Sequence, residues 1–293
     1  MKEINKMLRL QQPIYTNQNI IDLLTKNMNN ANLIGKLEDP NNCIQINQIW
    51  SQYDILAQTQ QLFSIPQYNQ NGILNNVVGS LNYDDCIKLY TRYFSVQNKE
   101  IRKIYDEILV QSERCPYCGN IGISTQLDHY LPKQSYPQYS VYPKNLIPCC
   151  KDCNEGYKRT MLAQTEEEQL INPYFDKNIF FDEQWIVASY QATSLNDPNA
   201  IVSYTVNCPP NWSNIDRIRA KKHFEDLDLG VRFAKEANNQ IQTIHYYLQQ
   251  FLDNQWSYQQ IYDFCINTGS HRPINHWERV MYQALCNYIQ TLL

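Results

Sequence analysis

The sequence predicts an α+β protein that is mainly helical, with a small module near the middle of the chain that contains two strands and one helix. Three observations predict this architecture. Apolar residues recur at intervals of three and four residues on both sides of the module, as on one face of an α-helix. Two short segments, 126–131 and 146–149, have the length of strands. Two C-x-x-C pairs bracket these segments, and such pairs hold metal ions in small folds.

Length and charge limit the possibilities. The 293 residues, 43% of them hydrophobic, suffice for one large domain or a few small ones. The formal net charge of −4 argues against a protein that coats nucleic acid. The sequence has no apolar run of about 18 residues, and its first residues lack the apolar core of a signal peptide. These features predict a cytoplasmic protein that does not span a membrane.

Cysteine usage agrees with a reducing compartment. Four of the ten cysteines stand in the two C-x-x-C pairs. The other six are isolated in the sequence and are expected to be buried free thiols: Cys43, Cys86, Cys149, Cys208, Cys265 and Cys286.

Residues 1–112 are expected to form a helical N-terminal region. The clearest periodic pattern stands at its end, where five apolar side chains between Ile101 and Leu109 share one helix face. Pro40 and Pro66 mark two expected loops. The predicted helices cover 17–28, 49–63, 82–94 and 101–109, and the predicted loops cover 35–42 and 66–72.

The central module is expected to span residues 113–168 in the order strand, strand, helix. Gly119 and Gly122 lie in a turn-rich knuckle that opens the module. The connection between the two strands contains three Pro and three Tyr residues and is expected to be an ordered loop. The predicted elements are a knuckle at 114–123, strands at 126–131 and 146–149, a loop at 132–143 and a helix at 153–165.

Residues 169–293 are expected to form a mostly helical C-terminal region with a short β-hairpin. Ser213 and Ser257 have the sequence context of N-caps, while Gly269 is expected to end one helix and Asn275 to open the last. No catalytic motif stands here, so the region is expected to pack against the central module or to bind a partner. The predicted strands cover 185–191 and 201–206, and the predicted helices cover 214–227, 229–253, 257–267 and 276–291.

The two C-x-x-C pairs predict a structural zinc site. The pairs are Cys115 with Cys118 and Cys150 with Cys153. Each pair makes a tight turn whose two sulfurs point at one centre, and four thiolates close a tetrahedral site with no open position. The alternatives are four buried thiols without a metal, or a site that uses Cys149 in place of Cys150. Only Cys150 has the two-residue gap to Cys153.

Between and beside the cysteine pairs stand residue types that bind a hard cation through oxygen and activate water. Asp128 and His129 fall in the first predicted strand, Asn145 precedes the second, and Asn154 opens the predicted helix. The structural alternatives are a core histidine, a turn residue at Asn145 and an N-cap at Asn154. Because side chains alternate along a strand, Asp128 and His129 can serve one site only if the strand bends or ends there. Pro132 is consistent with an end.

The order of these residues resembles the HNH, or ββα-metal, nuclease family in its zinc-knuckle form. Asp128 and His129 match the Asp-His pair at the end of the family's first strand. Asn145 matches the middle Asn of the motif, and Asn154 matches the helix residue that faces the metal. The resemblance covers about 45 residues. It departs from the family at Lys158, which follows Asn154 by four residues where the family often has a lysine after three.

The resemblance implies a zinc-stabilised ββα-metal nuclease module that hydrolyses phosphodiester bonds, in DNA rather than RNA. It makes His129 the general base that activates water. It makes Asp128 and Asn154 the ligands of one catalytic cation, Mg²⁺ or another divalent ion. Asn145 would orient the loop and the backbone of His129.

Substrate phosphate would be bound by basic residues of the same segment, if these are more than surface charge. The candidates are Lys133, Lys158 and Arg159. The segment 114–159 has six basic and three acidic residues, a balance that fits contact with a few phosphates. A second basic run, at 217–222, is either a solvated helix face or a further phosphate contact.

Two functions from different classes stay open on the sequence alone. One is a DNA endonuclease whose layout is similar to nucleases that pair with an ATPase in bacterial anti-phage defence, so DNA and an ATPase are the expected partners. The other is a catalytically inactive zinc module that binds nucleic acid or protein. The joint presence of Asp128, His129 and Asn154 favours the enzyme.

Overall fold

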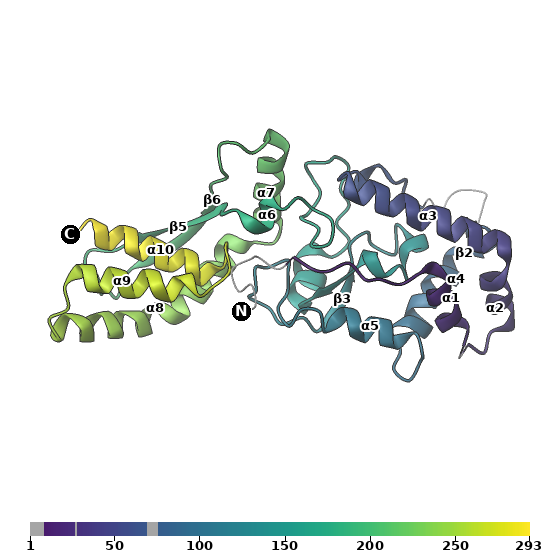
Figure 1. Ribbon diagram of the computed structural model, residues 1–293, viewed down its shortest axis with the longest axis horizontal. Helices are drawn as coiled ribbons and strands as arrows, with labels where there is room; N and C mark the ends of the chain where they lie inside the picture. Colours follow the sequence, from purple (N-terminus) through teal and green to yellow (C-terminus); the bar gives the residue numbers. More distant parts are fainter. Residues whose placement is uncertain (1–8, 27, 69–75) are drawn as a thin grey trace. The chain divides into compact units, whose positions relative to one another are not determined.

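The computed structural model describes residues 9–26, 28–68 and 76–293. The chain forms two compact units (Figure 1). The N-terminal unit comprises Leu10–Cys115 and Gly122–Asp176, and the C-terminal unit comprises Pro116–Ile121 and Lys177–Leu293 together with Arg9. The fold is α+β, as predicted: about half of the chain is helical, and the strands of the described residues pair in two-stranded antiparallel sheets.

The N-terminal unit begins with three helices, α1 (Asn17–Thr25), α2 (Ala31–Glu38) and α3 (Pro40–Gln58). The loop predicted over 35–42 is wrong, since only Asp39 separates α2 from α3. Asp39 is an N-cap whose carboxylate accepts hydrogen bonds from the backbone N–H groups of Asn41 and Asn42. Pro40 takes the first helical position, where a missing N–H costs nothing, so this proline starts a helix instead of breaking one.

The remaining elements that precede the central strands are short. A short turn, η1 (Leu62–Ser64), and a small hairpin, β1 (Asn76–Val78) with β2 (Leu81–Asn82), follow α3. Helix α4 (Tyr83–Lys88) starts at a capping box on Asn82 and continues as the π-helix η2 (Leu89–Phe94). Helix α5 (Arg102–Leu109) packs against the central sheet (Figure 1). The loop predicted over 66–72 lies partly outside the described residues.

The central sheet consists of β3 (Gln126–His129) and β4 (Leu146–Cys149), paired antiparallel so that His129 faces Leu146. The first strand ends at His129, two residues earlier than predicted. The connecting loop is ordered, as predicted, with two short 3₁₀ turns, η3 (Pro137–Tyr139) and η4 (Pro143–Asn145). The following helix, η5 (Asp152–Lys158), is π-helical and ends well before the predicted residue 165. Strand, strand and helix thus follow one another in the predicted order.

The C-terminal unit combines a hairpin with helices. Strands β5 (Ile186–Gln191) and β6 (Ile201–Val206) pair antiparallel over their whole length. Helix α10 (Trp277–Gln290) packs on β5 and α9 (Tyr258–Ser270), and α8 (Leu229–Asp253) packs on β6 (Figure 1). The helices of the unit are α6 (Ile179–Asp182), α7 (Asn214–Asp226), α8 (Leu229–Asp253), α9 (Tyr258–Ser270) and α10 (Trp277–Gln290). Ser213 and Ser257 cap α7 and α9, as predicted.

Two predicted helix boundaries in this unit are wrong because the residues serve packing. Gly269 lies inside α9, where a Cβ would come within 2.8 Å of the Cβ of Tyr282 in α10, so glycine permits the close approach of the helices. Asn275 is fully buried, and its side-chain oxygen accepts hydrogen bonds from the N–H groups of Trp185 and Ile186. His276 caps α10 in its place. No helix of the described chain has the length and apolar character to cross a membrane.

Candidate functional site

Four buried cysteines form one cluster. The Sγ atoms all lie within 4.8 Å of one another, and they belong to Cys115, Cys118, Cys150 and Cys153. In a tetrahedral zinc–thiolate site with Zn–S bonds of ~2.3 Å, neighbouring sulfurs lie about 3.8 Å apart. Shifts of about 1 Å would therefore close the four thiols around an ion. The cluster that the spacing predicts is present and could hold zinc.

Cys149 lies beside this cluster without belonging to it. Its Sγ is 4.0 Å from that of Cys115 and donates to the carbonyl oxygen of Cys150 at 3.2 Å. The contacts with Cys115 and Cys150, together with burial, raise the pKa of the Cys149 thiol. The geometry therefore favours Cys150 as the fourth ligand, in agreement with the C-x-x-C spacing.

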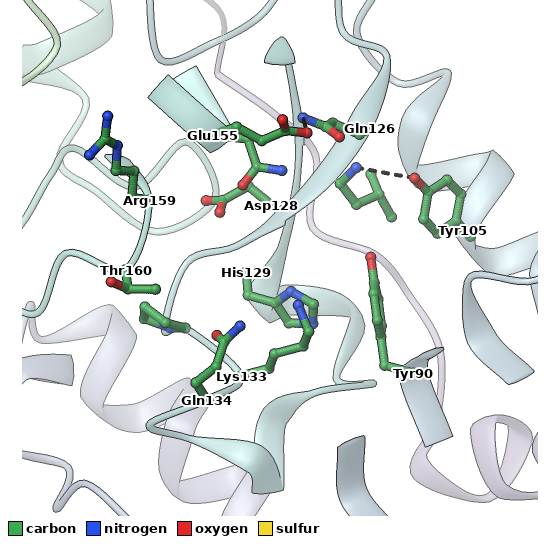
Figure 2. Close-up of a pocket in the computed structure, with 13 residues that line it drawn as sticks. Tyr90, Tyr105, Gln126, Asp128, His129, Lys133, Gln134, Glu155, Arg159 and Thr160 are labelled. Carbon is green, nitrogen blue, oxygen red and sulfur yellow. Dashed lines mark hydrogen bonds between the residues drawn. The ribbon is translucent and has the colours of Figure 1, made fainter. Parts of the chain in front are cut away.

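A pocket of about 460 Å³ in the N-terminal unit gathers most of the other candidate residues. Figure 2 shows Tyr90 and Tyr105 on one side and Arg159 and Thr160 on the other. Asp128, His129, Lys133, Asn154 and Arg159 line it, whereas Asn145 and Lys158 do not. The remaining lining residues are Tyr90, Tyr105, Gln126, Leu127, Pro132, Gln134, Glu155 and Thr160.

The imidazole of His129 is held by two neighbours. Nε2 lies 2.8 Å from the carbonyl oxygen of Ser140, so Nε2 donates and Nδ1 is left as the acceptor. The ring of Tyr90 meets the imidazole edge-on, with centroids 4.4 Å apart. Burial, followed by the charge of Lys133, lowers the pKa of His129 to about 3, so the ring is neutral near pH 7. A neutral, oriented imidazole can accept a proton.

The carboxylate of Asp128 is buried and ion-paired. Nζ of Lys158 lies 3.0 Å from Oδ2 and 3.3 Å from Oδ1, and also donates to the carbonyl oxygen of His129 at 2.8 Å. Both partners are nearly inaccessible to solvent, since their side chains are 2% (Lys158) and 4% (Asp128) exposed. The sequence suggested Lys158 as a phosphate contact, but its ammonium lies inside the protein.

Asn145 fastens the loop that follows His129. Its Oδ1 accepts from the N–H of Leu131 at 2.8 Å and from the Tyr53 hydroxyl at 3.2 Å. Its Nδ2 donates to the carbonyl oxygens of Leu131 at 3.0 Å and Tyr139 at 3.3 Å. The side chain is fully buried and does not reach the pocket. These are the contacts of a residue that orients the loop.

Replacing Asn145 by alanine should lower the free energy of unfolding by about 3 kcal/mol, because several buried backbone and hydroxyl groups lose their partners. Chemical denaturation followed by tryptophan fluorescence measures the change. Asn154→Ala is the matched control and should change stability by less than about 0.5 kcal/mol. Equal stability losses in the two variants would contradict the orienting role of Asn145.

Asn154 is not the N-cap of its helix. Lys151 occupies that position, and Asn154 lies in the first turn, half-buried at the pocket wall. Its side-chain amide is therefore not engaged in capping the helix, and its oxygen can serve a ligand in the pocket.

Two basic side chains, those of Lys133 and Arg159, line the pocket. The ammonium of Lys133 lies 5.4 Å from the centroid of the Tyr90 ring, and burial lowers its pKa. Arg159 is exposed, with Nε donating to the carbonyl oxygen of Gly156 at 2.8 Å. Its backbone has φ 48° and ψ −118°, a conformation that L-residues rarely adopt and that is often found at functional sites.

The aromatic wall of the pocket was not predicted from the sequence. Tyr90 comes from η2 and Tyr105 from α5, both outside the central module. The Tyr105 hydroxyl accepts a hydrogen bond from the N–H of Leu127 at 3.3 Å, next to Asp128. Both tyrosines stand at apolar positions of helical patterns, where an aromatic residue usually means core. The only available signal was a hydroxyl on an otherwise apolar face.

The side chains of the basic run at 217–222 largely contact residues of the C-terminal unit. Arg219 is buried, with its guanidinium 5.4 Å from the centroid of the Phe180 ring. Lys221 and Lys222 pair with Glu225 and Asp226, one helical turn further on. These contacts favour a structural and solvated face over a phosphate contact.

Comparison with known proteins places the chain in a family. No protein-family model and no solved structure match it. Protein ea31 of Escherichia phage lambda is 38% identical over 250 residues, which cover 80% of this chain and 83% of ea31. The chain belongs to the ea31 family. The likeness includes most of both proteins, so ea31 is expected to share the two-unit fold.

A second similarity of this ea31-family protein is confined to a segment. Septu protein PtuB of Bacillus thuringiensis is 35% identical over 71 residues, which cover 23% of this chain and 26% of PtuB. Most of each chain therefore lies outside the match.

Proposed function

We propose that this protein is a metal-dependent endonuclease of the HNH type that hydrolyses phosphodiester bonds in DNA. The observation that carries the proposal is the convergence of Asp128, His129 and Asn154 on one pocket. They come from a strand and a helix that follow the order of the ββα-metal module, beside a four-cysteine cluster.

His129 is the general base of the proposed reaction. The Ser140 carbonyl oxygen fixes the tautomer, so the acceptor nitrogen Nδ1 is available to take the proton of the attacking water. Strand β3 ends at His129, and the Asn145 side chain holds the next turn of backbone. The Ser140 carbonyl oxygen therefore orients the ring of His129, and the Asn145 side chain fixes the backbone that follows it.

Asp128 and Asn154 would hold the catalytic cation, Mg²⁺ or a similar divalent ion. Both side chains line the pocket and offer oxygen, the donor type that hard cations prefer. When bound, such an ion stabilises the charge that develops on the scissile phosphate and the leaving oxygen. The four cysteines are the complementary structural site, since thiolates select zinc.

Lys133 and Arg159 would contact the substrate phosphates at the two sides of the pocket. Replacing both by glutamine should weaken DNA binding and reduce the slope of log affinity against log salt by roughly 0.7 to 0.9 per lost contact. Filter binding or fluorescence anisotropy at several salt concentrations measures both quantities. The matched control replaces Lys221 and Lys222 by glutamine and should change neither. A reduced slope in the control alone would move the DNA contact to α7.

We further propose a role in anti-phage defence, with an ATPase as partner. The similarity to Septu protein PtuB supports this assignment together with the layout of the chain. Co-purification with a co-expressed ATPase from the same genomic neighbourhood tests it, and absence of a complex at micromolar concentrations would remove the partner from the proposal.

The second candidate is a zinc module that binds nucleic acid or protein without catalysis. The observation that favours it is the contact of the Lys158 ammonium with both carboxylate oxygens of Asp128. The ammonium occupies the oxygens that a catalytic cation would need. Incubation of the purified protein with supercoiled plasmid and Mg²⁺ separates the two functions. The nuclease should convert the plasmid to a nicked form, and EDTA should stop the conversion, whereas a binding module should only retard the plasmid on a gel.

A further inference from the structure

We infer that Lys158 is a positioning residue that fixes Asp128 and the end of strand β3, and that it does not bind DNA. The inference rests on the proposed nuclease function for its catalytic meaning. Its structural basis is a three-point contact of one ammonium with both carboxylate oxygens of Asp128 and with the carbonyl oxygen of His129. One cation thereby sets the position of two consecutive residues that serve the pocket.

Accessibility excludes Lys158 from a direct role with substrate. Its side chain is 2% exposed, and it is not among the residues that line the pocket. Asp128 contacts the ammonium and also lines the pocket. A phosphate in the pocket would meet Lys133 or Arg159 before Lys158, so the effect of Lys158 must pass through Asp128 and His129.

Helix η5 carries Lys158 on a widened turn. The N–H of Arg159 donates to the carbonyl oxygen of Asn154 at 2.9 Å, a bond that spans five residues instead of four. Such a bond widens the turn by one residue. The widened turn closes at Arg159, whose positive φ ends the helix.

Both the backbone and the side chain of His129 are anchored in this arrangement. Lys158 binds its carbonyl oxygen, while Ser140 accepts from its ring nitrogen Nε2. Loss of the ammonium would also leave the Asp128 carboxylate without its buried counter-charge. Both changes alter the geometry of the reacting groups and leave the pocket cations in place. A positioning role therefore affects turnover more than DNA affinity.

The test compares Lys158→Met, which keeps the aliphatic chain, with Lys151→Met, an exposed lysine of the same helix that is 3.8 Å from Glu155. In Lys158→Met we expect cleavage at saturating DNA to fall at least about 10-fold, because the proposed base and the proposed cation ligand lose their fixed positions. The DNA dissociation constant in EDTA and its salt slope should stay within about twofold of the parent values. Lys151→Met should match the parent in all three.

Two results with Lys158→Met in these three measurements would overturn the inference. Weaker DNA binding with a salt slope reduced by roughly 0.7 to 0.9, at unchanged saturated rate, would make Lys158 a phosphate contact. No change in rate, affinity or slope would show that the Lys158–Asp128 ion pair affects neither cleavage nor DNA binding. If Lys158→Met fails to fold, the double variant Lys158→Met/Asp128→Asn removes both buried charges, and its DNA affinity should equal that of Asp128→Asn alone. A further loss of affinity in the double variant would again indicate a phosphate contact.

A readout independent of cleavage separates this inference from the proposed function. In ¹H–¹⁵N spectra of the histidine side chains, His129 of the parent should appear as the single Nε2-protonated tautomer. Lys158→Met should broaden or split this signal, and Lys151→Met should leave it unchanged. A parent protein that cleaves no DNA but loses the single tautomer in Lys158→Met would refute the nuclease and keep the positioning role. An unchanged tautomer in a folded Lys158→Met variant would refute the positioning role even if the parent is a nuclease.

Discussion

Replacing His129 by alanine should reduce DNA cleavage by a factor on the order of 10² or more, while the protein stays folded and keeps its zinc. The expected loss follows from the oriented, neutral imidazole, which takes the proton from water in the proposed reaction. Plasmid nicking under single-turnover conditions measures the rate, and circular dichroism with metal analysis checks the fold. The ring is buried against Tyr90, so a small drop in thermal stability is also expected.

The companion variant, Asp128→Ala, should act differently. It should raise the Mg²⁺ concentration needed for half-maximal cleavage, because it removes a proposed ligand and leaves the base in place. Near wild-type cleavage by His129→Ala would show that His129 is not the base. A raised Mg²⁺ requirement in His129→Ala, instead of in Asp128→Ala, would exchange the two proposed roles.

Structural features that depend on residues close together in the sequence could be predicted from local spacing. The cysteine cluster, the two central strands and the hairpin of the C-terminal unit each follow from a pattern within a few residues. The position of Asp128 and His129 in one pocket also follows from local sequence. Strand β3 ends at His129, so the two side chains need not point to opposite faces of the sheet.

Features that depend on distant contacts could not be predicted in this way. Tyr90 and Tyr105 reach the pocket from helices whose apolar periodicity looks like ordinary core. Asn275 looked like a helix start, but it satisfies two N–H groups at the beginning of β5, about 90 residues away in the sequence. Lys158 was a candidate for a phosphate contact or a surface charge, and nothing in the sequence indicated that its ammonium would pair with Asp128 inside the protein.

Replacing Cys153 by alanine should abolish zinc binding and destabilise the central module, a larger effect than any substitution in the pocket. The freshly purified parent protein should contain about one zinc per chain, as a closed four-thiolate site requires. Structural zinc sites contribute apparent binding free energies of roughly 10 kcal/mol or more in small zinc modules, so loss of one ligand should cost most of the stability of the surrounding fold. Elemental analysis and thermal melting measure the two effects.

Cys149→Ala is the matched control, because Cys149 is equally buried and lies 4.0 Å from Cys115 without belonging to the cluster. It should keep about one zinc per chain and lose only the packing of one small side chain, on the order of 1 kcal/mol. Zinc content below about a tenth of an equivalent in the unchelated parent would refute the site itself, since a closed site binds one ion. Loss of zinc in Cys149→Ala, with retention in Cys150→Ala, would instead exchange the ligand. The expected opposite result follows from β4, which ends at Cys149 and lets Cys150 turn toward Cys153 at the start of η5.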